Sequence, residues 1–199
     1  PDVPGLAKAA YYTSETLFAL PDLPHRLLIL GAGRVGVELA QSYRSLGRDV
    51  TLLDHGTLLA DQDSEAVALV REHLLRSGVE LLENTRIVRV QPMTAGVSLD
   101  IDGPQGHAMR NHGDLVIAAG RRARIAGLGL EAASVAYGTE GIVTDARMRT
   151  SNKRIFALGD CVEGPHSTHS AQHQAGVAIR NILFGLRAKT QPDAVPRVV

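Results

Sequence analysis

The stretch from Leu27 to Asp54 limits what this chain can fold into more than any other part of the sequence. An apolar run at 27–30 has the composition of a buried parallel strand. It leads into three glycines spaced Gly-x-Gly-x-x-Gly, after which apolar side chains recur at helical spacing until Gly47. A second apolar run, 50–53, ends at Asp54. The pattern predicts a strand, a tight turn, a helix and a second parallel strand.

The three glycines each have a physical role in binding a dinucleotide. Gly31 permits the tight turn, Gly33 lets a pyrophosphate approach the backbone, and Gly36 lets the helix pack closely on the strand. Free N–H groups at the helix N-terminus favour an anion. A strand–helix turn without a ligand is the alternative. We expect the phosphates to lie along this loop, which comprises Gly31, Ala32, Gly33, Arg34, Val35 and Gly36.

The aspartate that ends the second strand favours NAD over NADP. Asp54 lies 23 positions after Gly31, close to the offset of roughly 20 expected for a carboxylate that binds a ribose hydroxyl. A carboxylate there accepts hydrogen bonds from the ribose diol and repels a 2′-phosphate. The residues that follow, beginning with His55, contain no arginine cluster for such a phosphate. His55 can itself carry partial positive charge, so we include it among the residues expected to contact the cofactor.

Composition excludes several other classes of function. Lysine plus arginine and aspartate plus glutamate both number 21, so no basic surplus indicates nucleic acid or an anionic membrane as a partner. No apolar run reaches the roughly 18–20 residues of a membrane span. The single cysteine, Cys161, excludes an internal disulfide framework and fits a reducing compartment. No signal peptide precedes the first strand, so we expect a cytoplasmic protein.

The rest of the chain predicts an α/β fold with a Rossmann-like parallel sheet, helices on both faces and an antiparallel three-stranded meander. A second helix is expected to begin at Asp61 or Asp63 and to end at Gly78, before a third strand at 79–82. The further elements expected are meander strands at 86–90, 97–101 and 106–110, an apolar strand at 114–120, short strands at 142–143 and 155–158, and a helix at 168–184.

Several separated motifs agree on one resemblance. Besides the glycine loop with Glu38, they are Pro4-Gly5-Leu6, Asp114 through Gly120-Arg121, Leu128-Gly-Leu-Glu131, the segment 150–161 and the helix at 168–184. The chain resembles the class I pyridine nucleotide–disulfide oxidoreductases, the group of dihydrolipoamide dehydrogenase, glutathione reductase and mercuric reductase. The mercuric-reductase-like members look closest.

The resemblance implies how the chain is divided. In that family an NAD(P) domain is inserted into an FAD domain, and a C-terminal dimerisation domain follows. Residues 25–119 resemble the NAD(P) domain, 1–24 and 120–190 resemble partial FAD-domain segments, and 191–199 form a tail. The family's first FAD motif, its redox-active cysteine pair and its dimerisation domain have no counterpart here. We therefore expect a fragment of a larger flavoenzyme, homodimeric when intact.

The resemblance also implies roles for particular residues. Glu38 corresponds to a glutamate at the nicotinamide–flavin junction that pairs with a lysine, although it can also be read as a solvated helix residue. Ala119, Gly120 and Arg121 correspond to the nicotinamide end, but the family's usual Pro-Asn after the arginine is absent. The residues implied to contact FAD are Gly159 and Asp160, with Thr168 and His169 near the flavin ring.

A metal site is the remaining possibility to weigh. His169 and His173 are four residues apart and would share a helix face, as paired zinc ligands do, and Cys161 and His166 are nearby in sequence. The cysteine belongs to the flavin motif, however, and no carboxylate or second cysteine completes a ligand set. We expect no metal.

The function predicted is that of the NAD(H)-binding portion of an FAD-dependent oxidoreductase that transfers hydride between NADH and flavin. The chain alone is expected to bind NAD(H), to lack most of the FAD site and to be inactive. One alternative is a flavin-independent nucleotide-binding or redox-sensing module. Another is half of a flavoenzyme whose remaining parts come from a second polypeptide.

Overall fold

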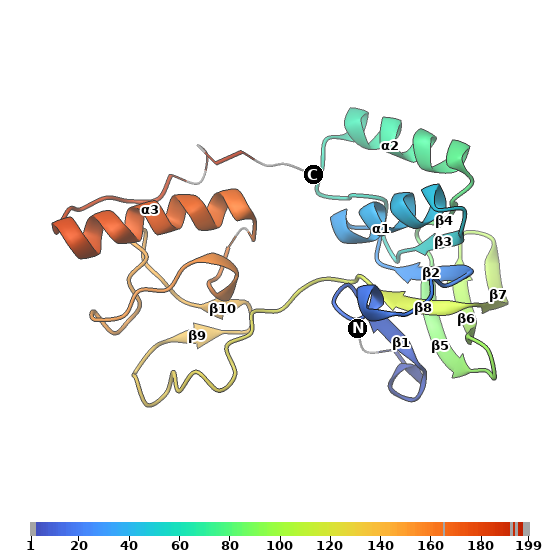
Figure 1. Cartoon of the computed structure of the whole chain (residues 1–199), viewed down its shortest axis with the longest axis horizontal. Coiled ribbons are helices and arrows are strands. Elements are labelled where there is room, and N and C mark those ends of the chain that lie inside the picture. Colours follow the sequence, from blue (N-terminus) through green and yellow to red (C-terminus); the bar gives the residue numbers. More distant parts are fainter. Residues whose placement is uncertain (1–2, 165, 192, 194, 197–199) are drawn as a thin grey trace. The chain divides into compact units, whose positions relative to one another are not determined.

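The computed structural model describes residues 3–164, 166–191, 193 and 195–196. The chain divides into two compact units, unit 1 over Pro1–Gly120 and unit 2 over Arg121–Val199. Figure 1 shows the elements of each unit. None of the helices in the described part of the chain has the length and hydropathy needed to span a bilayer.

Unit 1 is built on a five-stranded parallel sheet with strand order β1-β8-β2-β3-β4. The predicted parallel sheet is confirmed, with β2 at its centre. The register places Leu28 between Leu115 of β8 and Thr51 of β3. The strands are β1 (Tyr11–Thr13), β2 (Arg26–Leu30), β3 (Asp49–Leu53), β4 (Glu80–Leu82) and β8 (Asp114–Ile117).

Both long helices of unit 1 begin and end where the sequence predicts. Helix α1 (Arg34–Ser45) is followed by Gly47, whose φ of 77° lies in the left-handed region. Helix α2 (Ser64–Ser77) begins at Asp63, whose carboxylate accepts hydrogen bonds from two N–H groups of the first turn. Of the two aspartates considered for this cap, Asp63 is the one that forms it. Gly78, also left-handed, ends the helix.

The alternation of side chains along β2 separates two cores. Leu27 and Ile29 point to a core that includes residues of α1 and α2, whereas Leu28 and Leu30 point to the opposite face. That second face is covered by an antiparallel sheet, as well as by the short 3₁₀ helix η1 (Leu6–Lys8). The prediction of helices on both faces is therefore corrected, since α1 and α2 both pack on one face (Figure 1).

The covering sheet is the predicted three-stranded meander. Its strand order is β5-β6-β7, and all pairs are antiparallel. Each strand runs about two residues beyond its expected end because the ladder continues to the turns. The strands are β5 (Arg86–Pro92), β6 (Val97–Gly103) and β7 (Gly106–His112). A second 3₁₀ helix, η2 (Leu17–Ala19), contributes Leu17 to the helix-side core.

Unit 2 contains the hairpin β9 (Tyr137–Gly138) and β10 (Gly141–Ile142), the 3₁₀ helix η3 (Gly159–Cys161) and the helix α3 (Thr168–Phe184). The predicted helix is confirmed over its full length. The predicted strand at 155–158 is wrong: the segment makes only an isolated bridge between Phe156 and Arg149. The hydrogen bond from Ile155 N to Asn152 O closes a tight turn just before the segment, and the bond from Thr150 N to Ile155 O belongs to that bridge.

Two side chains expected in helix stripes lie in solvent. Leu46 is 58% exposed because it caps the end of α1 rather than continuing its buried face. Ile182 is 55% exposed, whereas Val177, Ala178 and Asn181 form the buried side of α3. The helical spacing of Ala171, Ala175, Ala178 and Ile182 in the sequence predicts that they line one face of this helix, so the buried stripe of α3 is rotated relative to that prediction.

Candidate nucleotide-binding site

The predicted loop lies at the carboxyl edge of the parallel sheet, where β2 ends. β2 is flanked by β3, reached through α1, and by β8, which returns much later in the chain. The chain thus departs to opposite sides of β2, which makes this edge a topological switch point. In open α/β sheets, ligands bind in the crevice at such points.

The three glycines of the loop meet different surroundings. Gly31 has a φ of 112°, and a Cβ placed on it would lie 2.7 Å from the carbonyl carbon of Ala118 at the end of β8. A Cβ on Gly36 would lie 1.8 Å from the carbonyl oxygen of Gly31. Both positions are closed to any side chain. Gly33, in contrast, has nothing within 4 Å of its ideal Cβ, so the backbone there faces open space.

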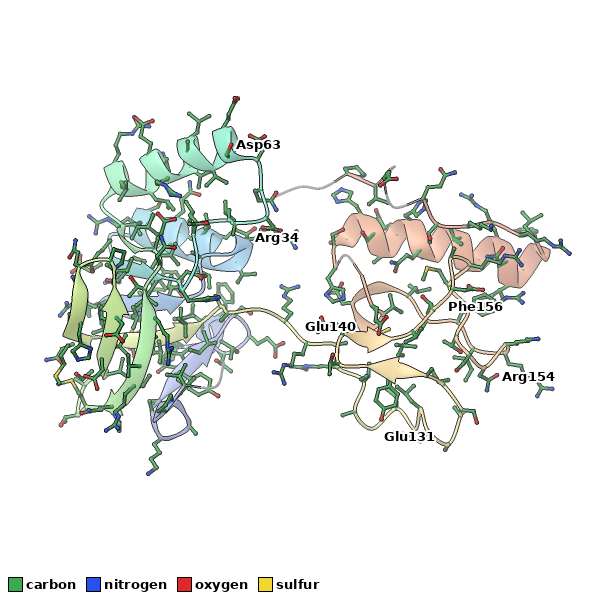
Figure 2. The ribbon with its side chains drawn as sticks, turned by 180° about the vertical axis from the view of Figure 1, so that it is seen from behind. Arg34, Asp63, Glu131, Glu140, Arg154 and Phe156 are labelled. Atoms are coloured by element: carbon green, nitrogen blue, oxygen red, sulfur yellow. The ribbon has the colours of Figure 1, made fainter. Side chains whose placement is uncertain are left out.

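The N-terminus of α1 opens onto that space. Gly33 is the N-cap residue and has no side chain that could cap the helix. The first hydrogen bond of the helix runs from Val37 N to Gly33 O. The N–H groups before Val37 are the donors that a helix leaves without internal partners. Arg34 is exposed at the first turn of the helix (Figure 2). The loop therefore offers uncapped donors, a helix dipole and a guanidinium to an anion.

The carboxylate of Asp54 is joined to the glycine loop. Its Oδ2 accepts a hydrogen bond from Ala32 N at 2.6 Å, and its Oδ1 accepts one from Gly56 N at 2.8 Å. The Nδ1 of His55 lies 3.1 Å from the same Oδ1, although that imidazole is 90% exposed. The side chain of Asp54 is only 17% exposed. A carboxylate has about four acceptor positions, so Asp54 still has capacity for a ligand hydroxyl.

The segment after Asp54 is held by a residue that the sequence analysis missed. Leu58 N donates to Glu83 Oε1 at 2.6 Å, and Arg71 of α2 binds both oxygens of Glu83 at 2.9 Å. Gly56 O also accepts a hydrogen bond from Asn84 N. A carboxylate directly after a third apolar strand was the available signal, because the carboxyl ends of parallel strands share one edge.

The other unit 1 residues expected at the cofactor also lie near strand ends. Ala119 and Gly120 follow β8 directly and are exposed, and Gly120 has a φ of 100° with open space around its ideal Cβ. Glu38 is exposed on α1, and no hydrogen bond or ion pair engages its carboxylate in the described part of the chain. The structure thus collects the glycine loop, Asp54 and the end of β8 at one edge.

The residues expected at flavin lie in unit 2. Gly159 N donates to Gln174 Oε1 of α3 at 2.7 Å, which fixes η3 against that helix. Asp160 is 58% exposed, with Arg121 Nη1 3.8 Å from its Oδ2. Thr168 and His169 are exposed in the first turn of α3. Unit 2 therefore brings Arg121 to Asp160, although the two were expected to face different parts of the cofactors.

Three of the four residues considered as metal ligands have separate partners. His166 Nε2 lies 3.0 Å from Val162 O, Cys161 Sγ donates to Leu158 O, and His173 Nε2 accepts from Gln191 N. Over the residues that the structure describes, no three His, Cys, Asp or Glu side chains are grouped to hold a metal ion.

A parallel sheet with a glycine loop, an uncapped helix and a strand-end carboxylate at its switch point defines unit 1 as a dinucleotide-binding α/β unit. The comparison with protein families is more specific. Residues 1–175 match the family described as pyridine nucleotide-disulphide oxidoreductase. The chain belongs to this family, as the sequence motifs predicted.

Individual relatives agree with the family assignment. The chain is 34% identical over 202 residues to a mercuric reductase of Bacillus cereus, covering all of this chain and 32% of that protein. It is 35% identical over 163 residues to a dihydrolipoyl dehydrogenase of Thermus scotoductus, covering 80% of this chain and 35% of the relative. The chain thus spans about a third of the length of these curated relatives.

A solved structure has the same fold. The Cu(II) complex of the HOCl-induced flavoprotein disulfide reductase RclA from Escherichia coli superposes with a TM-score of 0.86 at 29% sequence identity. The match covers 97% of this chain and 44% of that one. In that solved structure, the matching fold is part of a longer flavoprotein.

Proposed function

We propose that unit 1 binds NAD(H), and that the intact protein transfers hydride between NADH and FAD. The observation that carries the proposal is the hydrogen bond from Ala32 N to Asp54 Oδ2. It joins the glycine loop to the strand-end carboxylate, so that the expected pyrophosphate and ribose positions lie side by side. This spacing is what a dinucleotide requires.

Different residues of the chain would bind different parts of the cofactor. The donors of Gly33 and the first turn of α1 would bind the pyrophosphate, with Arg34 adding charge. Asp54 would accept a hydrogen bond from the adenosine ribose, and His55 would lie beside it. Gly120, which has no side chain, would leave room at the end of β8 for the nicotinamide, and Glu38 would face the reacting end. The nicotinamide ring itself would supply or accept the hydride.

NAD rather than NADP follows from the charges at the end of β3. The carboxylate of Asp54 is partly buried at this strand end, so a 2′-phosphate placed there would be repelled by it. Arg71 contributes no free guanidinium to this segment because Glu83 binds it in a bidentate pair. His55 is a weaker cation than arginine at neutral pH.

Flavin binding is proposed for the intact protein only. Asp160 would accept hydrogen bonds from the hydroxyls of the flavin's side chain, and the first turn of α3, with Thr168 and His169, would lie near the ring. The exposed carboxylate of Asp160 fits such a role, since its weak contact with Arg121 leaves acceptor capacity free. Further segments of the intact protein would provide most of the flavin contacts. They would also provide the dimer contacts.

The test is a titration of the purified chain with NADH and with NADPH, followed by the nicotinamide fluorescence. We expect NADH to bind more tightly, and the Asp54→Ala variant to lose that preference. Tighter binding of NADPH by the wild-type chain would overturn the choice of cofactor, and no binding of either would overturn the proposed function.

The visible spectrum of the same sample separates the proposal from its alternative. The compactness of unit 1, which contains the loop, Asp54 and Gly120 together, favours a flavin-independent nucleotide-binding module as the second candidate. Stoichiometric flavin in the purified chain would exclude that module. NADH binding by a full-length protein that purifies without flavin would support it.

A further inference from the structure

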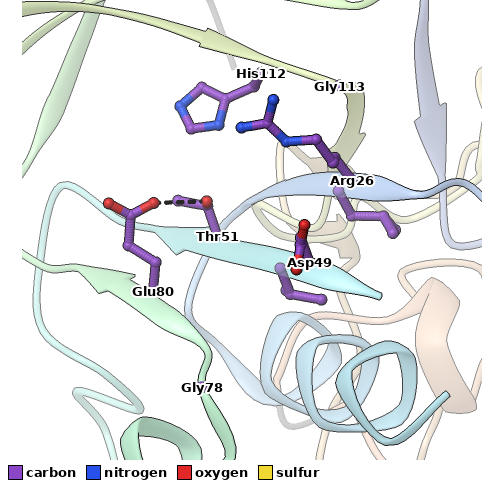
Figure 3. A pocket seen from close by; sticks show the side chains of 9 residues that line it. Arg26, Asp49, Thr51, Gly78, Glu80, His112 and Gly113 are labelled. Atoms are coloured by element: carbon purple, nitrogen blue, oxygen red, sulfur yellow. Dashed lines mark hydrogen bonds between the residues drawn. The ribbon is translucent and has the colours of Figure 1, made fainter. Parts of the chain in front are cut away.

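A recess lies at the opposite, amino edge of the same sheet. It is a hollow of about 220 Å³ lined by the first residues of three parallel strands, Arg26, Asp49 and Glu80, together with Thr51 and His112 (Figure 3). The carboxyl ends of these strands lead to the candidate nucleotide site, so the hollow and that site are at different edges of the sheet.

The two carboxylates of this hollow, Glu80 and Asp49, already have partners within the protein. Glu80 accepts a hydrogen bond from Thr51 Oγ1 at 2.8 Å and another from Arg110 Nη1. Burial opposes ionisation of Glu80, but these two contacts together hold its pKa below the usual value. Asp49 is paired with Arg44 Nη1 at 3.3 Å. Neither acid is therefore left with an unopposed negative charge.

Arg26 is the charged group of the hollow that lacks a partner. Its guanidinium makes no ion pair or hydrogen bond to any residue that the structure describes. The neighbouring His112 is also incompletely satisfied, because its buried Nε2 has no hydrogen-bond partner in the described structure. Burial lowers the pKa of His112, and the positive charges of Arg110 and Arg26 act in the same direction, while Glu80 opposes them. When the arginines that pair the two carboxylates, Arg44 and Arg110, are counted with the lining, Arg26 is the one charge without a counterion among the described residues of the hollow.

We propose that this hollow binds a small oxyanion, such as a phosphate or a carboxylate, with Arg26 as its principal donor. The planar guanidinium presents parallel N–H groups that match two oxygens of either anion. The lining is predominantly polar backbone and side chain, and the hollow is large enough for one such group. The ligand is the phosphate or carboxylate end of a metabolite or the free ion.

The imidazole of His112 provides a local reporter of binding. An anion beside Arg26 offsets the positive charges of Arg26 and Arg110 and leaves Glu80 and Asp49 in place, so it raises the pKa of His112. By linkage, the anion then binds more tightly as the pH falls through the titration range of that histidine. An effect of general ionic strength would instead act on all exposed histidines alike.

The experiment is an NMR titration of the His112 ring in the whole chain with inorganic phosphate, with acetate and with chloride. We expect saturable chemical-shift changes of the His112 ring with at least one oxyanion and none with chloride. Whichever of phosphate and acetate binds more tightly identifies the ligand as a phosphate or a carboxylate. Arg26→Gln should weaken binding at least about tenfold, and Arg26→Lys should weaken it less. Arg86→Gln, an exposed arginine that begins a meander strand, is the matched control and should bind as the wild type does.

The outcome is independent of nucleotide binding. Saturating NADH should leave the phosphate or acetate affinity at His112 unchanged, because the cofactor is proposed to lie at the other edge. Shifts that match those in chloride, that persist in Arg26→Gln, or that disappear with NADH would each overturn the proposal.

Discussion

Asp54 in unit 1 and Asp160 in unit 2 have the same proposed task in very different surroundings. Each is expected to bind hydroxyls of a nucleotide cofactor. Asp54 is 17% exposed and accepts backbone hydrogen bonds from Ala32 and Gly56. Asp160 is 58% exposed, and among the described residues its carboxylate is paired only with Arg121, at 3.8 Å. Unit 1 positions its carboxylate with its own backbone. Unit 2 leaves its carboxylate to be positioned by whatever else binds there.

The difference teaches which site this chain can complete alone. A preorganised carboxylate loses little freedom when a ligand arrives, so its hydrogen bonds contribute more to affinity. In unit 1 the loop, the helix terminus and the carboxylate belong to one hydrogen-bonded assembly. We therefore expect nucleotide binding to be a property of unit 1, and flavin binding to require residues beyond unit 2.

The largest effect is expected from adding one methyl group to the loop. Gly36→Ala places a Cβ 1.8 Å from the carbonyl oxygen of Gly31, so the turn between β2 and α1 must open. We expect unit 1 to lose more than about 3 kcal/mol of unfolding free energy, measured by urea denaturation. Gly33→Ala is the matched control, because its Cβ meets nothing; it should leave stability nearly unchanged yet weaken NADH binding. Equal stability of the two variants would contradict this account of the loop.

The next effect tests the two aspartates directly. Asp54→Asn replaces one acceptor oxygen by an amide that cannot accept from Ala32 N or Gly56 N, and it removes the charge. NADH affinity, measured by fluorescence titration, should fall at least about tenfold. Asp160→Asn should leave NADH affinity unchanged in the same assay. An equal loss in both variants would mean that the two units form one nucleotide site.

A smaller effect is expected where Glu83 holds the segment after β3. Glu83→Ala removes the acceptor of Leu58 N and leaves Arg71 without its bidentate partner, in a site where the two side chains are 20% and 32% exposed. We expect a loss of about 1–3 kcal/mol in unfolding free energy and a reduced preference for NADH over NADPH. Glu72→Ala breaks an exposed pair with Arg76 and should cost at most about 0.5 kcal/mol. A cofactor preference unaltered by Glu83→Ala would reduce Glu83 to a structural role.

The smallest effect expected is on the pH dependence of the unfolding free energy of unit 1. Burial lowers the pKa of His112 in the folded state, so the unfolded chain binds more protons as the pH falls below about 6.5 and unit 1 loses stability there. The pKa of Glu80 is also lowered, so its contribution is present above its unfolded value and is lost at more acidic pH. Urea titrations across this range should show the first loss in the wild type and not in His112→Gln. A variant that retains the full loss would assign it to another group.

Much of unit 1 was predictable because its signals are local. Glycine spacing, apolar runs and Asp63 fix the turn, the strands and a helix start within a few residues of sequence. The contact of Asp54 with Ala32 was not predictable, because it depends on where β3 ends relative to β2. The role of Glu83 was missed for the same reason, since its partners Leu58 and Arg71 come from other elements.

The errors follow from what periodicity cannot distinguish. An apolar run such as 155–158 has the composition of a strand, but its hydrogen bonds with Met148 and Thr150 form one isolated bridge rather than a ladder. The sequence pattern also gives no preference between a helix and a second sheet as the cover of a sheet face. Here the meander fills that place, with residues such as Ile87 and Leu99 against Leu28.

The strand β1 has a practical consequence for anyone who dissects this protein. It lies before the glycine loop in sequence, yet it pairs with β8 through Tyr11 to Thr13 and so forms the outer edge of the sheet. A version trimmed to begin at residue 25 would expose the N–H and C=O groups of β8 that now pair with β1. Such an exposed strand edge promotes pairing with other chains and aggregation. It would also remove Leu17, which is 1% exposed in the core. The shortest expressible form of unit 1 therefore begins well upstream of its nucleotide loop.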